Sequence, residues 1–277
     1  MLRLATSDGW WLVTHPDHAH LAGEFAAAWG NELFASPEPR AHVLRGIYAH
    51  DDGWRARDAV PTVTREGKPA AFSTELVGKY SAFEEIDLED YLAVRRNAVL
   101  AMAEEDPYAG ILISMHTHNL LSERADRSTI RPEQLPLLDS FLASQQSLQC
   151  ELRRQLLDIA SVSPNQLDSD QLDNELTENF RLLQATDNLS LLSCVDFAGP
   201  ATLLHPLRTQ QDTAKEIEVK RIGERSYRLS PYPLREPVMR FALRARFVPG
   251  VRFASSAELA DRLVEAPVQT LEVTISE

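Results

Sequence analysis

Four side chains in this sequence could together hold a metal ion: His18, the adjacent pair His50 and Asp51, and Asp187. Each lies on the apolar face of a stretch with helical periodicity. A carboxylate on such a face is costly unless an opposite charge or a metal ion binds it. Imidazole and carboxylate groups together suit Fe, Mn, Zn, Co or Ni better than Ca²⁺. The sequence therefore predicts a divalent transition-metal site with these four residues as ligands.

The elements that must position these ligands are mostly helices. Capping residues and apolar periodicity predict helices over residues 16–29, 36–50, 88–104, 107–123, 132–160 and 169–194. His18 shares a helical face with Ala22, Phe25 and Trp29, and His50 shares one with Val43 and Ile47. Asp187 shares a face with Leu176, Phe180, Leu183 and Leu191. Three different helices thus aim a metal-binding group at the core.

Strands are predicted at both ends of the chain. Ser7-Asp8-Gly9 is typical of the turn of a short N-terminal hairpin. After residue 200 the pattern predicts one helix near 256–266 and strands at Glu216–Arg221, Tyr227–Leu229, Phe241–Val248 and Leu271–Ile275. We therefore expect a mainly α fold with that hairpin and a small β-rich C-terminal appendage. The expected domains are a helical metal-binding domain over 1–199 and a small β-rich part over 200–277 packed on it.

Composition narrows the classes of partner. The chain of 277 residues has 28 Lys and Arg against 41 Asp and Glu, a formal charge of -13. This acidity argues against nucleic acid and against an anionic membrane surface, so a small molecule is the expected partner. No segment has the roughly 20 consecutive apolar residues of a transmembrane helix. The 2 cysteines form no metal-binding or disulfide pattern, which favours a cytoplasmic location. The oligomeric state is left open.

Three segments carry a resemblance to a known superfamily. They are His18-x-x-Leu21-Ala22-x-x-Phe25-Ala26, then Ile47-Tyr48-Ala49-His50-Asp51-Asp52-Gly53, and last Leu183-x-x-x-Asp187-Asn188-Leu189. In their order and separation they resemble the HD-domain metal-dependent phosphohydrolases. The resemblance implies an HD-type helical bundle with His18, His50, Asp51 and Asp187 as its ligands. Further segments, over nearly the whole chain, resemble more closely an uncharacterised bacterial family within that superfamily. They are Pro16-Asp17-His18-Ala19, His50-Asp51-Asp52-Gly53-Trp54, Ser114-Met115-His116, Pro231-Tyr232-Pro233-Leu234 and Arg246-Phe247-Val248-Pro249.

Other residues could act on a substrate. Many HD hydrolases have a lysine after the glycine, where this chain has Trp54, so phosphate would be neutralised by other cations such as Arg45, Lys79 or Arg124. We place Trp54 and these three cations in the substrate site.

Three further residues are candidates for proton transfer: Asp52, Asp58 and His116. Asp52 could equally be the turn residue before Gly53. His116, which shares its helix with His118 but not its face, could be a fifth ligand, or simply a core histidine.

Three functions fit this pattern. The leading one is a metal-dependent hydrolase of a phosphate ester or nucleotide, in which the ion activates water. The alternatives are an HD-type di-iron oxygenase and a non-enzymatic module that uses the metal for stability or ligand sensing.

Overall fold

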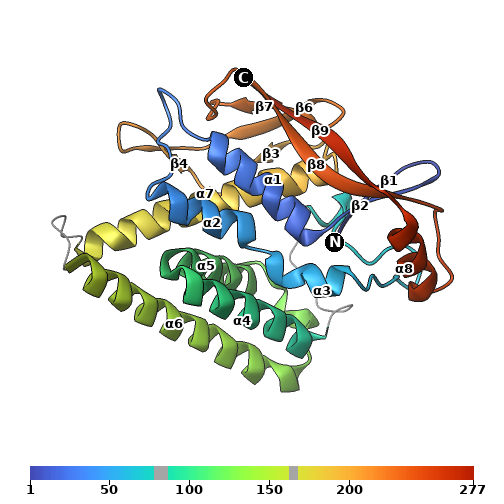
Figure 1. Cartoon of the computed structure of the whole chain (residues 1–277), viewed down its shortest axis with the longest axis horizontal. Coiled ribbons are helices and arrows are strands. Elements are labelled where there is room, and N and C mark those ends of the chain that lie inside the picture. The colour runs from blue at the N-terminus through green and yellow to red at the C-terminus, as the bar shows by residue number, and fades with distance from the viewer. Residues whose placement is uncertain (78–86, 162–167) are drawn as a thin grey trace.

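The computed structural model describes residues 1–77, 87–161 and 168–277, and its helices and strands are labelled in Figure 1. The α-helices are α1 (His15–Ala28), α2 (Arg40–Ala49), α3 (Arg55–Asp58), α4 (Leu88–Glu105), α5 (Pro107–Glu123), α6 (Leu135–Ser161), α7 (Ser169–Cys194) and α8 (Ser256–Glu265). The predicted helices are confirmed, except that α2 begins at Arg40 and not at residue 36, and α6 begins at Leu135 and not at residue 132, after a 3-10 turn over Pro132–Gln134. Pro39, the cap of α2, is extended, so residues 36–38 stay in the preceding loop.

Side-chain caps explain where the helices that carry ligands begin. The Thr14 hydroxyl accepts a hydrogen bond from the Asp17 amide (3.1 Å), and Pro16 occupies the first turn of α1. Asp106 caps α5 by accepting from two amides of its first turn. Asp168 and Gln171 form a reciprocal capping box at the start of α7. These caps fix the registers that bring His18, His116 and Asp187 to the core.

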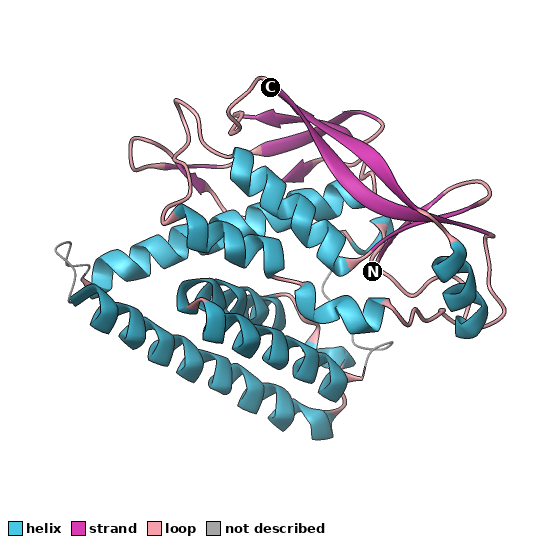
Figure 2. Ribbon diagram, in the orientation of Figure 1, coloured by secondary structure: helices cyan, strands magenta, loops and turns pink. Residues whose placement is uncertain are grey.

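The strands form one large sheet rather than an appendage. They are β1 (Leu2–Ala5), β2 (Gly9–Val13), β3 (Ala201–Thr202), β4 (Leu207–Arg208), β5 (Ala214–Lys215), β6 (Glu218–Gly223), β7 (Ser226–Ser230), β8 (Val238–Pro249) and β9 (Val268–Ser276). Seven of them make a mixed sheet in the order β1-β2-β8-β9-β7-β6-β3, while β4 and β5 form a separate pair. Figure 2 shows this sheet as a curled layer against the helices.

The expected mainly α bundle with a separate hairpin and a small β appendage is therefore wrong. The N-terminal hairpin is the edge of the large sheet, because β2 pairs antiparallel with β8 from Gly9↔Pro249 to Leu12↔Arg246. The sheet is mixed because β7 and β9 are parallel, whereas β8 and β9 are antiparallel. The division into parts 1–199 and 200–277 stays a prediction.

Helix α1 joins the sheet to the helical body. Its Phe25 ring meets Phe241 of β8 edge to face, with 4.7 Å between ring centroids. On its other sides α1 packs against α2 and α7, and α5 packs against α2, α4, α6 and α7. The predicted ligands thus lie in the middle of the molecule. Among the described residues, no helix has both the length and the apolarity needed to cross a bilayer.

Candidate metal centre

The four predicted ligands meet in the core between α1, α2 and α7. His18 and His50 are each 1% exposed, Asp51 is 5% and Asp187 is 6% exposed. His18 Nε2 lies 3.0 Å from Asp51 Oδ2, and His50 Nε2 lies 3.3 Å from Asp187 Oδ1. The two imidazole rings are edge to face, with 5.2 Å between centroids. All four side chains are buried, as helical periodicity predicted, and their role as metal ligands stays a prediction.

Hydrogen bonds on the far side of each ring determine which nitrogen is available to an ion. The Ile47 carbonyl can only accept, so His50 Nδ1 donates to it (2.8 Å). Ser190 donates its hydroxyl hydrogen to the Asp187 carbonyl (2.8 Å) and therefore accepts from His18 Nδ1 (3.0 Å). In the neutral rings both Nε2 atoms then carry no hydrogen and each has a lone pair. Histidines that bind a metal ion usually donate the N–H of their other ring nitrogen to an oxygen acceptor in this way.

These lone pairs face carboxylate oxygens, which carry lone pairs too. Such an arrangement needs a cation between the two groups, either a proton or a metal ion. His50 Nε2 is buried without a hydrogen-bond partner among the described residues, even though Asp187 Oδ1 is near. The donor set therefore fits a divalent transition ion.

The pKa values of the candidate ligands depend strongly on one another. Burial would raise the pKa of Asp187, but the neighbouring histidines, His50 above all, hold it below its ordinary value. Burial likewise opposes ionisation of Asp51, while Arg95, His50 and His18 lower its pKa well below the usual range. Both carboxyls are thus anionic at neutral pH and suited to bind a cation.

His116 of α5 extends the cluster. Its ring lies 5.1 Å from that of His50, and it is 1% exposed. Two groups of three have ligand atoms that all lie within 4.8 Å of one another: His18, His50 and Asp51, and His50, His116 and Asp187. Burial lowers the pKa of His116 to about 3, so this ring is neutral at physiological pH.

The tautomer of His116 depends on how the side-chain amide of Gln184, on α7, is oriented. The Gln184 Nε2 atom lies 2.6 Å from His116 Nδ1, and the Oε1 atom of the same amide has no partner among the described residues. With Nε2 donating, His116 carries its proton on the nitrogen that would face an ion. The opposite amide orientation, in which Oε1 accepts from Nδ1–H, frees that nitrogen for coordination.

Arg95 of α4 is a residue of this site that the sequence interpretation missed. It is 7% exposed, and its Nη1 donates to Asp51 Oδ1. Burial would lower its pKa, but Asp51 and Tyr91 raise it, so the guanidinium stays charged. A signal was available, because Arg95 shares a helical face with Tyr91, Leu92 and Val99, all buried.

Comparison with known proteins places the chain in a family. Residues 1–250 match the family described as "Protein of unknown function (DUF3891)". The chain belongs to this family. Neither a curated protein nor a solved structure matches it.

Of the predicted proton-transfer residues in this DUF3891 chain, His116 lies among the candidate ligands and the two aspartates do not. Asp58 is buried, and its carboxylate contacts His15 Nδ1 (3.0 Å) and the Met1 amino nitrogen (2.8 Å). Asp52 is 48% exposed on its side chain and pairs with Arg55 (2.9 Å). Neither belongs to a group of candidate ligands among the described residues.

The predicted substrate residues are dispersed. Trp54 is buried, with its ring 5.0 Å from that of His15 and the Arg95 guanidinium 5.1 Å from its centroid. Arg45 is 53% exposed on its side chain and lies 3.3 Å from Asp106, and Arg124 is exposed. Lys79 lies outside the described residues. The structure thus brings Trp54 close to the ligands and leaves the two described cations on the surface.

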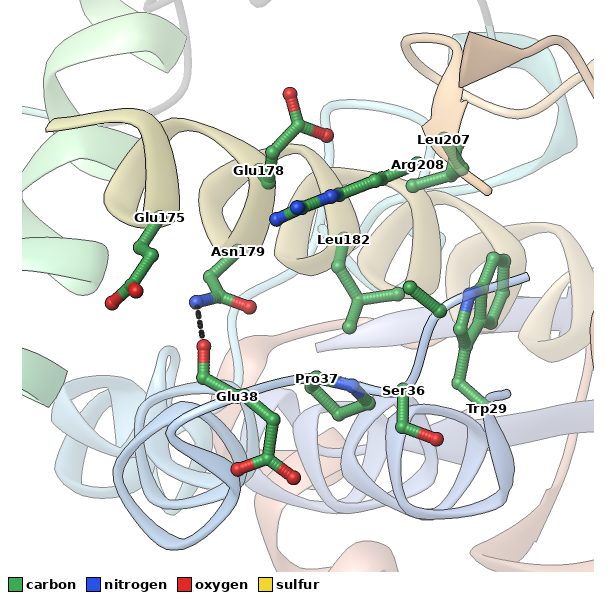
Figure 3. Close-up of a pocket in the computed structure, with 11 residues that line it drawn as sticks. Trp29, Ser36, Pro37, Glu38, Glu175, Glu178, Asn179, Leu182, Leu207 and Arg208 are labelled. Atoms are coloured by element: carbon green, nitrogen blue, oxygen red, sulfur yellow. Dashed lines mark hydrogen bonds between the residues drawn. The ribbon is translucent and has the colours of Figure 1, made fainter. Parts of the chain in front are cut away.

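A cavity of about 110 Å³ lies elsewhere, between α7, the loop before α2 and β4 (Figure 3). Glu38, Glu175, Glu178 and Arg208 are among its lining residues. Asn179 closes one side by donating to the Glu38 carbonyl (2.7 Å). None of the predicted ligands lines this cavity, so we locate the functional centre from side-chain chemistry and not from cavity size.

The protonation of His50 gives a prediction for ion binding. Burial would lower its pKa, but Asp51 and Asp187 outweigh burial and raise it to about 9. A divalent ion needs the unprotonated Nε2, so binding at pH 7 must release a proton. We expect the apparent association constant for Co²⁺ to rise about tenfold per pH unit from 7 until about 9. Calorimetry in buffers of different ionisation enthalpy would count the released proton, and an affinity that is flat over this range would contradict the prediction.

Proposed function

We propose that this chain is a metal-dependent hydrolase that acts on a phosphate ester or nucleotide. One observation carries the proposal: His50 Nε2 is buried, without a hydrogen-bond partner among the described residues, and lies among carboxylates that need a cation. His18, His50, Asp51 and Asp187 would hold the ion, with His116 as a further ligand. The resemblance of the three ligand-bearing segments to HD phosphohydrolases supports the same ligand set and suggests the substrate class.

A divalent ion in such a site supplies a Lewis acid and brings the pKa of water near to neutrality. The chain's own residues do the rest. Ile47 and Ser190 hold the two imidazoles with Nε2 toward the carboxylates. Arg95 is the buried cation in contact with the ligand set and provides positive charge beside it. Trp54 and Tyr91 cover that guanidinium with their rings and limit its contact with water.

The burial of the ligands favours one rival, a non-enzymatic module that binds the ion for stability or sensing. All four predicted ligands are at most 6% exposed, as is usual for closed structural sites, whereas catalytic metals keep an open position. The two functions share the ion and differ in turnover.

Two measurements test the proposal. Elemental analysis of protein purified without added metal should find a divalent transition ion at a stoichiometric level. The loaded protein should then hydrolyse members of a panel of phosphomonoesters, phosphodiesters and nucleotides. Bound ion with no turnover across the panel would favour the non-enzymatic module. Absence of bound ion, even after dialysis against Mn²⁺, Fe²⁺, Co²⁺, Ni²⁺ and Zn²⁺, would refute both.

A further inference from the structure

The residues around Arg95, beside the candidate metal centre, stabilise its positive charge. The Arg95 guanidinium lies 5.1 Å from the ring centroid of Trp54 and 5.4 Å from that of Tyr91, and its Nε donates to the Tyr91 hydroxyl (3.3 Å). A buried guanidinium is costly without an anionic partner, and Asp51 is that partner. Contacts with three residues, Trp54, Tyr91 and Asp51, therefore hold the guanidinium, and the guanidinium in turn holds Asp51.

This ion pair uses one of the two oxygens of Asp51. Oδ1 accepts from Arg95, whereas Oδ2 faces His18 Nε2 at 3.0 Å. Only Oδ2 is directed toward the imidazole that would share an ion with it. A carboxylate held in this way offers Oδ2 to an ion, and the contact of Oδ1 with Arg95 disfavours a bridge in which each oxygen binds a different ion.

His50 imposes the same limit. Both groups of candidate ligands include His50, and its Nδ1–H donates a hydrogen bond to the Ile47 carbonyl. A single lone pair on Nε2 binds one ion. The two groups therefore cannot each bind an ion through His50, and a second ion would lack both His50 and the Oδ1 atom of Asp51, which contacts Arg95.

The net charge of the buried site also favours one bound ion over two. Asp51, Asp187 and Arg95 together carry a net charge of about −1 when the imidazoles are neutral, as they are when they bind a metal ion. One divalent ion brings the buried cluster to about +1, and a second would bring it to about +3. Buried charge of one sign is costly, so one ion is the favoured load.

We propose that Arg95 is a positioning residue that holds Asp51 by one oxygen and limits the centre to one divalent ion per chain. This inference rests on the metal binding in the proposed function. Arg95 fills the position from which a second cation would reach Asp51, so the centre is mononuclear because of a side chain of its own.

The ion count is tested on the full chain with Mn²⁺. Ion-free protein is loaded with Mn²⁺ and freed of excess, its manganese content is measured, and its electron paramagnetic resonance spectrum is recorded. We expect one ion per chain and the spectrum of isolated Mn²⁺. Two ions per chain with an exchange-coupled spectrum would overturn this inference and leave the metal site standing. No retained Mn²⁺, with none of the other ions bound either, would overturn the metal site itself.

Variants test the role of Arg95. Arg95→Gln removes the charge, and we expect either Mn²⁺ affinity about tenfold weaker or the binding of a second ion, since partners of metal ligands are typically worth 10- to 100-fold in affinity. Arg95→Lys keeps the charge and should recover part of the loss, and it replaces Arg95→Gln if that variant does not fold. Arg96→Gln, an exposed neighbour on the same helix, is the matched control. One ion bound with unchanged affinity in both Arg95 variants would overturn the assignment.

Discussion

His50→Ala is expected to abolish ion binding and, with it, any hydrolysis. His50 belongs to both groups of candidate ligands, and its Nε2 is the buried atom that lacks a partner among the described residues. Even the partners of metal ligands are worth 10- to 100-fold in metal affinity, so removal of the shared ligand should weaken binding by more than about a hundredfold. Elemental analysis and a Mn²⁺ titration of the purified variant measure this loss.

The matched control is His20→Ala. His20 lies on α1 two residues after His18, but it is exposed and its ring packs against Tyr48. The control should retain the wild-type ion content and turnover. His50→Gln, which keeps a polar side chain, should lose the ion as His50→Ala does, and circular dichroism would show that both variants are folded. Ion content at the wild-type level in folded His50→Ala would show that the cluster is a packed core and not a metal centre.

The burial of the candidate ligands could be predicted because its signal is local. His18, His50 and Asp187 each stand on an apolar stripe with a period near 3.6, and burial of that stripe forces the polar group inward. Asp51 follows His50 directly, where the chain leaves α2, so both side chains reach the same region. A polar residue on an apolar face is a conflict between local preference and burial, and such conflicts mark functional sites.

Arg95 was missed although it gives the same local signal. Imidazoles and carboxylates are usual metal ligands, whereas most arginines are surface cations, so the position of Arg95 in the sequence alone does not indicate a role at a metal centre. Ser190 and Gln184 were missed for a different reason. Both are small or medium polar residues on the buried face of α7, and their role depends on which ring lies across from them. Periodicity along one helix cannot supply that information.

The sheet could not be predicted from local patterns. Alternation identifies a strand but not its partner, and the N-terminal hairpin pairs with a strand near the other end of the sequence. The Trp10 indole donates to the Val251 carbonyl, a residue 241 positions away. The short strands β3, β4 and β5 have two residues each, too few for any periodicity to show. The predicted strands after residue 200 are confirmed as elements, and the error lay in how they assemble.

Asp58→Asn is expected to destabilise the fold, whereas Asp52→Asn is not. Asp58 is 4% exposed and accepts from the His15 backbone amide as well as from the Met1 amino group. Burial would raise the pKa of Asp58, but His15 and the Met1 amino group lower it to about 2. Burial lowers the pKa of the Met1 amino group and lowers that of His15 to about 4, so the cost is taken from the hydrogen bonds that the Asp58 carboxylate accepts, each worth about 1.5–3 kcal/mol when one partner is charged. Urea denaturation at pH 7 should therefore show a loss of about 3 kcal/mol in Asp58→Asn. An exposed pair such as Asp52 with Arg55 should cost less than about 1 kcal/mol.

The pH dependence separates a stabilising role of Asp58 from a role in proton transfer. Because the folded-state pKa of Asp58 is lowered to about 2, its stabilisation is complete above the ordinary value of 3.8 and is lost as the pH falls through about 2. The stability difference between wild type and Asp58→Asn should be constant from pH 7 to about pH 5 and shrink below about pH 4. Asp58→Asn should keep its bound ion, since Asp58 is in neither group of candidate ligands. If the variant is as stable as the wild type but has lost turnover, Asp58 is the proton-transfer group that the sequence predicted, and its contact with His15 serves to orient it.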